Sequence, residues 1–410
     1  MKTLHVQVSA MAHGGEALAR HEGKVVFVPY VLPGEDVLIE LTEERARYSR
    51  ARAIEILAPS SDRVEPRCQH FGICGGCQWQ HIAYERQATL REEILQSQLT
   101  RIAHLPDMSV EPTLVASDPW NYRNHVQLHL DDDGRLGFIA AEGRGVVPIA
   151  ECHIMHPLLW DAFSALEIDF PDLERLSLRA GIATGERMLI LETAGHTAPG
   201  VEVDLPISCV LLVGDGTPVT YVGDSYVTEI LAGRSLRISA ASFFQVHTSQ
   251  TEQLLAAVEK YANPQEDDVL LDLYCGVGTF GLYLSDKVAQ VIGIDSSEPA
   301  IEDARFNAEG MANLRYLQGS AEKVLPSIEE AIDLVILDPP RQGVSKEALA
   351  ALSSLAPSRV VYVSCDPATL ARDTGRMIQA GYELLEVQPV DMFPQTYHIE
   401  AVALLRPSSQ

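Results

Sequence analysis

The sequence lacks three features that define whole classes of protein. It has no apolar run long enough to cross a bilayer, and its opening, MKTLHVQVSA, lacks the basic start and apolar core of a secretory signal. Basic residues are scarce: 31 Lys and Arg stand against 57 Asp and Glu, which gives a formal net charge of -26. These absences predict a cytoplasmic protein with no membrane association, and they argue against indiscriminate binding to phosphate backbones.

Cysteine is also scarce, yet three of the seven cysteines stand together in CQHFGICGGC, residues 68–77. Because thiols stay reduced in the cytoplasm, such a cluster is more typical of a metal-binding or catalytic site than of a disulfide framework. Chance clustering is the alternative. We expect Cys209, in an apolar run, and Cys275, in a glycine-rich loop, to be packing residues.

Three styles of sequence follow one another along the chain. Residues 1–57 alternate apolar and polar positions between Gly, Pro and Asp turns, which predicts an OB-like antiparallel barrel with a local ribbon of arginines near residues 45–52. Residues 58–235 mix a polar linker, a helical stretch near 85–104 and strand-like runs, which predicts a mixed α+β domain. In residues 236–410 apolar runs alternate with helical stretches, which predicts an α/β domain with a doubly wound parallel sheet.

The apolar runs of the last region end in residues suited to ligand binding, because ligands gather at the carboxyl ends of parallel strands. After DVLLDLYC come Gly276, Gly278 and Gly281, which allow a tight turn and close backbone approach to a ligand at a helix start. Asp295 ends the next run, where its carboxylate can accept both hydroxyls of a ribose. The pair predicts a nucleoside cofactor. The pattern alone does not separate NAD from S-adenosylmethionine, and a glycine turn kept for helix packing is the alternative.

Three further residues favour methyl transfer to a planar base. LVILDPPRQGV places Asp338 before two prolines, and this stiff extended turn can lie beside an extruded nucleotide. RVVYVSCDPATLARD places Cys365 between a strand and a helix, where helix-end amides can lower the pKa of a thiol; a buried packing cysteine is the alternative. Glu400 precedes the last apolar run. A thiolate that adds to C6 of uracil and a carboxylate that removes the C5 proton are the parts that C5 methylation requires.

Five motifs in this order resemble the RNA uracil-C5 methyltransferases: FFQVH, DLYCGVGTFG, LDPPRQG, SCDPATLARD and MFPQTYHIE. The barrel resembles the TRAM domain of their 23S ribosomal-RNA branch. Cys68, Cys74 and Cys77, with the later Cys152, resemble the 4Fe-4S site of that branch. The similarity covers nearly the whole chain.

The resemblance implies a Rossmann-like methyltransferase domain that uses S-adenosylmethionine, with Cys365 as nucleophile and Glu400 as the proton-abstracting base. It implies cofactor contacts from Gln245, Tyr274, Thr279, Asp295 and Asp338. The implied substrate is a uridine of 23S rRNA in a locally unfolded segment, modified by a monomeric enzyme, and a tRNA uridine is the alternative. The helix near 85–104 is expected to pack on the catalytic domain.

Other readings stay open on the residues alone. Four thiolates can hold zinc or an iron–sulfur cluster, and the crowding of three on one loop favours a cluster. An NAD oxidoreductase with an iron–sulfur domain and a non-enzymatic RNA-binding protein are rivals, and neither would require Cys365. Phe243, Phe244 and Trp79 are candidates for stacking on bases, with burial in the core equally expected for each.

Four positions depart from the family pattern. Asp295 stands where Glu is common, Thr279 where Asn is common, Asp366 where Asn usually follows the cysteine, and Gln395 where His is frequent. The shorter Asp295 moves its carboxylate away from a ribose by one methylene. Asp366 adds negative charge beside Cys365, which raises the pKa of the thiol unless another group compensates.

Overall fold

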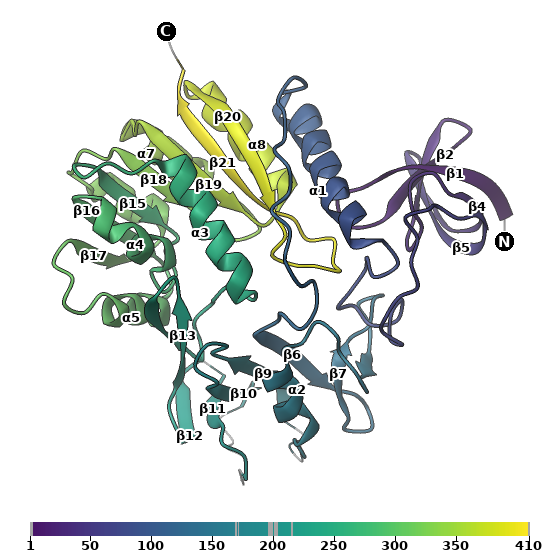
Figure 1. Ribbon diagram of the computed structural model, residues 1–410, viewed down its shortest axis with the longest axis horizontal. Helices are drawn as coiled ribbons and strands as arrows, with labels where there is room; N and C mark the ends of the chain where they lie inside the picture. The colour runs from purple at the N-terminus through teal and green to yellow at the C-terminus, as the bar shows by residue number, and fades with distance from the viewer. Residues whose placement is uncertain are drawn as a thin grey trace.

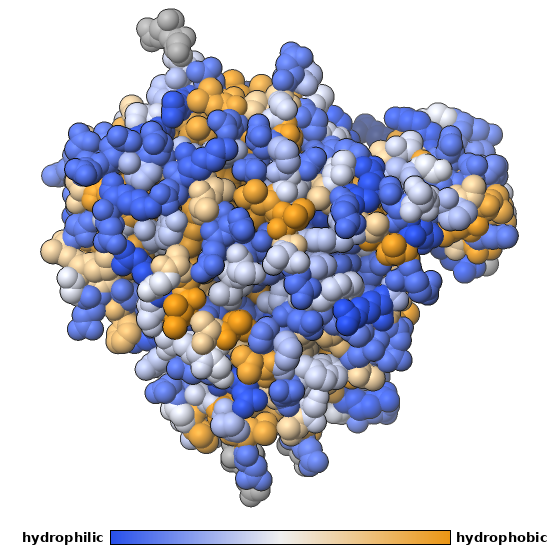
Figure 2. All heavy atoms as spheres, in the orientation of Figure 1, coloured by the Kyte–Doolittle hydropathy of each residue, from blue (hydrophilic) through white to orange (hydrophobic). Residues whose placement is uncertain are grey.

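The computed structural model describes residues 3–168, 170, 172–195, 200, 204–214 and 216–408. Within these ranges the strands form a closed barrel, two large sheets and a two-stranded hairpin. Figure 1 shows the barrel at the N-terminal end, the C-terminal sheet on the other side of helix α1 (Tyr84–Gln98), and the central sheet below them. Among the described residues no helix is both long and apolar enough to cross a membrane. Polar residues cover most of the face seen in Figure 2, and apolar residues form small separate groups.

The barrel has the strand order β1-β2-β3-β5-β4. Its strands are β1 (Thr3–Met11), β2 (Ala17–His21), β3 (Lys24–Val28), β4 (Asp36–Glu44) and β5 (Tyr48–Ala58). Along β1 the side chains of Leu4, Val6 and Val8 point inward and their neighbours face solvent, since successive side chains of a strand point to opposite faces. The predicted N-terminal barrel is therefore confirmed, but it is not wholly antiparallel, because β3 and β5 pair in parallel.

Helix α1 connects the barrel to the C-terminal sheet. Its Leu90 and Ile94 pack with the barrel interior, whereas Leu95 packs with the core of the sheet. The chain then continues into a π-helical turn (Leu99–Ala103) that lies against helix α8 (Pro367–Gln379). Because α1 contributes apolar side chains to both cores, it fixes the barrel relative to the sheet.

The central region forms a seven-stranded sheet in the order β12-β11-β10-β9-β6-β7-β8. Its strands are β6 (His125–Leu130), β7 (Leu136–Ile139), β8 (Val146–Pro148), β9 (Leu173–Ala180), β10 (Arg187–Thr193), β11 (Ser208–Leu212) and β12 (Pro218–Val222). Helix α2 (Pro157–Ser164) packs on it through Leu159 and Ala162. Cys209 is fully buried in this core, so its predicted packing role is confirmed.

A hairpin of β13 (Tyr226–Leu231) and β14 (Arg234–Ser239) follows. Its Val227, Leu236 and Ile238 pack in the same apolar cluster as the C-terminal sheet. The expected boundary at residue 235 falls inside β14, and because the same cluster also holds Met188 and Val210 of the central sheet, the hairpin packs between the two sheets.

The C-terminal sheet has seven strands in the order β17-β16-β15-β18-β19-β21-β20. They are β15 (Val269–Leu273), β16 (Gln290–Asp295), β17 (Leu314–Gln318), β18 (Leu334–Leu337), β19 (Arg359–Ser364), β20 (Tyr382–Val390) and β21 (Glu400–Pro407). The first five in this order run parallel, and β21 runs antiparallel to both of its neighbours. The four runs that the sequence predicts as parallel strands are β15, β16, β18 and β19.

Helices cover both faces of this sheet. On one face lie α3 (Thr248–Ala262), α4 (Thr279–Leu284) and α5 (Glu298–Asn307). On the other lie α6 (Ala321–Val324), a short 3-10 turn at Leu325–Ser327, α7 (Lys346–Ser354) and α8; a second 3-10 turn, at Ser285–Lys287, continues α4 on the first face. Successive residues of β15 face opposite layers, Leu270 toward the first and Leu271 toward the second. The predicted doubly wound fold is confirmed.

Candidate active site

The carboxyl edge of the C-terminal sheet brings the predicted site residues together. Asp295 ends β16, Asp338 follows β18 and Cys365 follows β19. Because β21 runs antiparallel to β19, its first residue, Glu400, lies at the same edge, and the pairing of Ser364 with Ala401 sets Glu400 beside Cys365. The acid and the thiol are therefore neighbours although 34 residues separate them in the sequence.

The glycine-rich loop turns tightly at this edge. Gly276 and Gly278 have φ values of 53° and 89°, in the left-handed region that favours glycine, and Tyr274 is held there too at 67°. The Gly276 amide donates to Asp295 Oδ2 at 2.9 Å, and the Ser297 amide donates to Asp295 Oδ1 at 2.8 Å. Asp295 thus joins the loop to the start of α5, and each of its oxygens retains a lone pair for a ligand.

Gln245 and Asp338 form the next part of the edge. Gln245 Nε2 donates to Asp338 Oδ2 at 3.4 Å, and the Gln245 carbonyl accepts from Asn124 Nδ2 at 3.0 Å. Burial raises the pKa of Asp338 to about 7, helped by the charges of Asp272 and Asp295. A cationic ligand at this edge would favour the ionised carboxylate.

Asp272 is a site residue that the sequence reasoning missed. It is fully buried in β15, its Oδ2 accepts from the Gly281 amide at 2.8 Å, and burial raises its pKa to about 7. Its Oδ1 has no hydrogen-bond partner within the described residues. The signal was present, since Asp272 is the acid of DLYCGVGTFG that precedes the glycines.

The remaining residues of the loop take different places. Thr279 is the first residue of the short helix α4 and is partly exposed. Cys275 is buried and its pKa is raised well above the ordinary thiol value by burial, which fits its predicted packing role. Burial likewise raises the pKa of Tyr274 to about 12.

The structure corrects the expectation of an acidified Cys365 thiol. Burial raises its pKa to about 12, with further increases from Glu400 and Asp338, a decrease from Arg341 and a smaller increase from Asp366. The helix-end amides do not reach the sulfur, because the Ala368 and Thr369 amides donate to Asp366 Oδ1 at 3.0 and 2.8 Å. In the free protein Cys365 is a protonated thiol.

Glu400 is buried more deeply than its neighbour Cys365. Its side chain is 2% exposed, and burial followed by the charge of Asp338 raises its pKa well above the ordinary carboxyl value, against a decrease from Arg341. Its Oε1 has no hydrogen-bond partner in the part of the chain that the structure describes. An unpartnered buried carboxyl oxygen is costly, and such groups are typical of catalytic sites.

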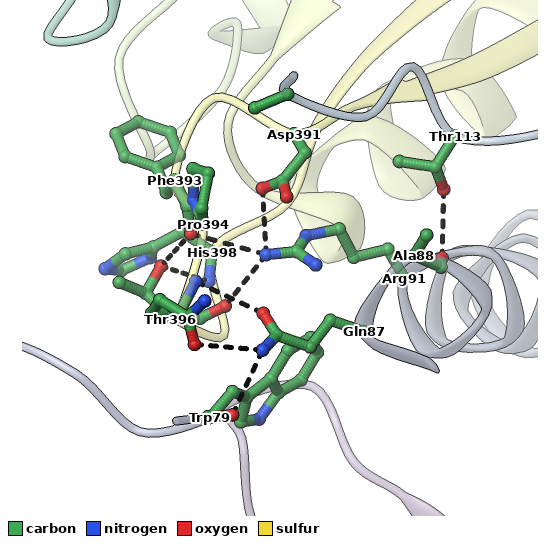
Figure 3. A network of polar contacts seen from close by, with 12 residues as sticks. Trp79, Gln87, Ala88, Arg91, Thr113, Asp391, Phe393, Pro394, Thr396 and His398 are labelled. Atoms are coloured by element: carbon green, nitrogen blue, oxygen red, sulfur yellow. Dashed lines mark hydrogen bonds and ion pairs between the residues drawn. The ribbon is translucent and has the colours of Figure 1, made fainter. Parts of the chain in front are cut away.

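The segment that precedes Glu400 is held by α1, as Figure 3 shows. Arg91 Nη2 donates to the carbonyls of Phe393 and Thr396 at 3.3 and 3.2 Å. Gln395 has a φ of 69°, and its side-chain oxygen accepts from Gln87 Nε2 at 3.0 Å. Gln87 Oε1 in turn accepts from the Gln395 amide at 3.2 Å, so the departure from the frequent His is matched by a glutamine on α1.

The four cysteines proposed as cluster ligands gather around one cavity. They are Cys68, Cys74, Cys77 and Cys152, all free thiols. Gly75 donates its amide to the Ile139 carbonyl at 2.9 Å, and Glu151 accepts from the Gln69 amide at 2.6 Å, which holds the cysteine loop against the segment that carries Cys152.

The electrostatics confirm that these thiols are near one another. Burial raises the pKa of Cys77 to about 12, and Cys152 and Cys74 raise it further. Among the described residues, however, no three His, Cys, Asp or Glu side chains are spaced to hold a single metal ion. For comparison, four cysteine sulfurs bound tetrahedrally to one zinc ion lie about 3.8 Å from one another, because the Zn–S distance is about 2.3 Å.

The same cavity, of about 1170 Å³, lies where the barrel, the cysteine loop, the central sheet and the catalytic edge meet. Its charged lining residues are Arg50, Arg52, Arg123, Arg341, Glu16, Glu142 and Glu151. Four arginines and three glutamates therefore line the cavity, although the whole chain is strongly acidic.

The three aromatic candidates for base stacking differ in their exposure to solvent. Phe243 is 68% exposed and lines the cavity. Phe244 and Trp79 are buried, the former in the core of the sheet and the latter in the core of the barrel, so the stacking interpretation is wrong for both. Apolar burial outweighs ligand contact at those two positions.

Comparison with known proteins agrees with this geometry. The family described as tRNA (Uracil-5-)-methyltransferase matches residues 219–408, and the TRAM domain matches residues 1–54. An uncharacterized RNA methyltransferase of Streptomyces avermitilis is 39% identical, with 99% of this chain and 98% of that protein covered. Another, of Thermosynechococcus vestitus, is 35% identical with 99% and 98% covered.

A solved structure extends the likeness to the whole fold. The Pyrococcus abyssi tRNA (uracil-54, C5)-methyltransferase, in complex with S-adenosyl-L-homocysteine, has a TM-score of 0.74 and 27% identity, with 98% of this chain and 100% of that chain covered. The sheet, the glycine loop and the acidic strand ends define a methyltransferase preceded by a TRAM barrel. The chain belongs to the RNA uracil-5-methyltransferase family. The predicted enzyme class is confirmed, and the oxidoreductase and non-enzymatic alternatives are wrong.

Proposed function

We propose that the protein methylates C5 of a specific uridine in 23S rRNA, with Cys365 as nucleophile, Glu400 as base and S-adenosylmethionine as methyl donor. The observation that carries the proposal is the placement of Glu400 beside Cys365 at the edge that also holds the glycine loop. A family that methylates uracil C5 requires such a thiol and such a base.

The chemistry balances with these two groups. The Cys365 thiol gives its proton to water and adds through sulfur to C6 of the uracil, which makes C5 nucleophilic. C5 would then take the methyl group that bound S-adenosylmethionine supplies, with S-adenosylhomocysteine as the leaving group. The Glu400 carboxylate accepts the proton from C5, the bond between sulfur and C6 breaks to release 5-methyluridine, and the Cys365 thiolate takes a proton back from water.

The cofactor fits the residues at the edge. Asp272 Oδ1 is a buried acceptor without a partner among the described residues, and Asp338 is a half-buried acid that a cationic ligand would keep ionised. We propose that Gln245, Tyr274, Thr279, Asp295 and Asp338 contact S-adenosylmethionine, together with Asp272. When bound, the cofactor supplies an electrophilic methyl group. The Pyrococcus abyssi enzyme with S-adenosyl-L-homocysteine supports this choice.

The RNA is proposed to enter the cavity between barrel and catalytic edge. Arg50 and Arg52 of the barrel line it but are paired with Glu16 and Glu40, so Arg341 beside Cys365 is the arginine best placed to meet a phosphate. Phe243 offers an exposed ring to an extruded base. We propose a division into a barrel, a central RNA-binding region and a catalytic domain.

The four gathered cysteines are proposed to hold a 4Fe-4S cluster. What supports the proposal is the donor set, because four free thiols line one cavity and cysteine thiolates are the usual ligands of such a cluster. A cluster could carry electrons or cross-link the loop, and the methyl transfer proposed here needs no electron. Its role is therefore proposed to be structural or RNA-facing.

A tRNA uridine is the second candidate substrate, because the matching family and the similar Pyrococcus abyssi enzyme both carry tRNA in their descriptions. Mass spectrometry of nucleosides from separately purified 23S rRNA and tRNA, from cells with and without the gene, distinguishes the two. Loss of 5-methyluridine from 23S rRNA alone supports the proposal. Loss of 5-methyluridine from tRNA alone would make tRNA the substrate. Loss from neither RNA would contradict the proposed methylation of uridine C5.

A further inference from the structure

The loop between β1 and β2 reaches from the barrel to the catalytic edge. It turns tightly, with the Ala12 amide donating to the Glu16 carbonyl at 2.8 Å and the Gly15 amide to the Ala12 carbonyl at 3.2 Å. A Cβ on Gly15 would lie 2.7 Å from Tyr397 Cβ, so only glycine allows this approach. Tyr397 stands three residues before Glu400. The barrel therefore touches the active-site wall directly.

At the tip of this loop, His13 meets the residue that follows the proposed nucleophile. His13 Nε2 lies 3.4 Å from Asp366 Oδ2, and the two side chains are 27% and 24% exposed. Asp366 Oδ1 is already used by the two amides at the start of α8. The two oxygens of Asp366 thus serve different partners, one in the helix and one in the barrel.

The orientation of His13 is set by this contact. Its other ring nitrogen, Nδ1, is buried without a hydrogen-bond partner among the described residues. The Asp366 backbone is also fixed, since its amide donates to Ser364 Oγ at 3.3 Å and Ser364 Oγ donates to its carbonyl at 3.1 Å. Any movement of the barrel loop would therefore reach the Ser-Cys-Asp turn through Asp366.

We propose that His13 is a positioning residue for methyl transfer, holding Asp366 and, in its protonated form, offsetting the charge of Asp366 beside Cys365, so that docking of the barrel sets the reactivity of the nucleophile. The inference rests on the proposed function of Cys365. Burial, Glu400, Asp338 and Asp366 all raise the pKa of the thiol, and Arg341 lowers it. A protonated His13 ring beside Asp366 would offset one of these increases, and a pair of unit charges about 4 Å apart is worth about fivefold in an equilibrium even in bulk water.

The test measures the reactivity of Cys365 in the full-length protein without RNA. The rate of iodoacetamide labelling of the Cys365 peptide is followed by mass spectrometry for wild type, His13→Ala, His13→Lys and Asp366→Asn. We expect His13→Ala to slow labelling about three- to tenfold and His13→Lys to stay within about twofold of wild type, because lysine keeps a cation near Asp366. His21→Ala is the matched control, since His21 is a barrel histidine that pairs only weakly with its neighbour Glu22 at 3.8 Å.

Asp366→Asn keeps an oxygen for the helix amides and removes the charge, so it tests the proposal even if His13→Ala does not fold. Labelling of Cys365 should be faster in Asp366→Asn than in wild type. The effect of His13→Ala on the labelling rate should be less than half as large in the Asp366→Asn background as in the wild-type background. Equal slowing in both backgrounds, or slower labelling in Asp366→Asn, would overturn the proposal.

The labelling needs neither RNA nor methyl transfer, so its result is separate from that of the proposed function. If wild type forms no 5-methyluridine while the His13 and Asp366 variants label as expected, the proposed methylation is wrong, but the proposed effect of His13 on the reactivity of Cys365 is supported. If methylation is normal and His13→Ala labels like wild type, the coupling fails alone.

Discussion

Arg91 Nη2 lies 2.9 Å from Asp391 Oδ1, and both side chains are fully buried. The pair joins α1 to the start of the segment that leads to Glu400, and the guanidinium also lies over the ring of Trp79 at 5.1 Å (Figure 3). Asp391 accepts a further hydrogen bond from the Tyr84 hydroxyl at 2.9 Å. The Arg91 guanidinium therefore connects Trp79 in the core of the barrel, helix α1 and the segment that leads to Glu400.

Arg91→Met should lower the free energy of unfolding by about 3–5 kcal/mol, because it leaves the Asp391 carboxylate buried without its cation. Urea unfolding measures the change. Arg86→Ala, which removes a partly exposed pair with Glu93 on the same helix, should cost less than about 1 kcal/mol. Equal losses in the two variants would contradict the role assigned to the buried pair.

Labelling of Cys365 should rise with pH across the whole accessible range. With a thiol pKa of about 12, the thiolate fraction at pH 8 is lower than that of an ordinary thiol by roughly a thousandfold. The rate of peptide-resolved alkylation between pH 7 and 10 measures it, and urea-unfolded protein is the reference. A plateau below pH 9 in the folded protein would contradict the raised pKa.

Glu400→Gln should trap RNA on the enzyme. Addition and methyl transfer can still occur, but no carboxylate removes the C5 proton, so turnover should fall by about 10²–10⁴-fold while a covalent complex accumulates. Denaturing gels with S-adenosylmethionine and target RNA detect the complex. Cys365→Ala and the double variant should form none, and normal turnover of Glu400→Gln would show that another group is the base.

Asp272 should make stability depend on pH. Its pKa in the folded protein is raised to about 7, so between about pH 4 and 7 the folded state holds a proton that the unfolded state has lost. The contribution is present at low pH and is lost as the pH rises through 7. Relative to Asp272→Asn, which keeps an acceptor for the Gly281 amide, wild type should lose free energy of unfolding between pH 5 and 8. A constant difference between the two proteins would contradict the raised pKa.

Protein purified without oxygen should contain about four iron and four sulfide per chain if the cysteines hold a 4Fe-4S cluster. Cys77→Ser removes the most buried of the four thiols and should lose most of the iron, as measured by metal analysis and visible absorption. Cys209→Ala, in the core of the central sheet, is the control that should keep it. Zinc in place of iron would overturn the cluster assignment.

Much of the site was predictable because it depends on local pattern. Gly276, Asp295, Asp338 and Cys365 each follow an apolar run, and parallel strands necessarily bring such ends to one edge. The place of Glu400 was implied by family resemblance and not by its surroundings in the sequence, since it depends on the long-range insertion of β21. Asp272 was missed because it lies inside its strand, where an acid is usually excluded.

The errors concern burial and charge, which a single sequence does not reveal. Trp79 follows the cysteine loop and resembles a stacking residue, but the barrel and α1 enclose it completely. The pKa of Cys365 was expected to fall because a helix begins after it. It rises because the thiol is buried, because two acids from other strands lie beside it, and because Asp366 takes the helix amides. Such effects require the positions of residues far apart in the chain.

The position of β21 has a consequence for the order of folding. This strand follows β20 in the sequence but lies between β19 and β20 in the sheet, so the last two strands cannot be added in the order in which they are made. β20 lacks its inner neighbour until β21 inserts. Because β21 begins with Glu400, the event that closes the sheet also brings the carboxylate to the thiol. A copy with an unfinished sheet has the cysteine without its neighbouring acid, and under the proposed mechanism only a completed core could release the RNA that the cysteine captures.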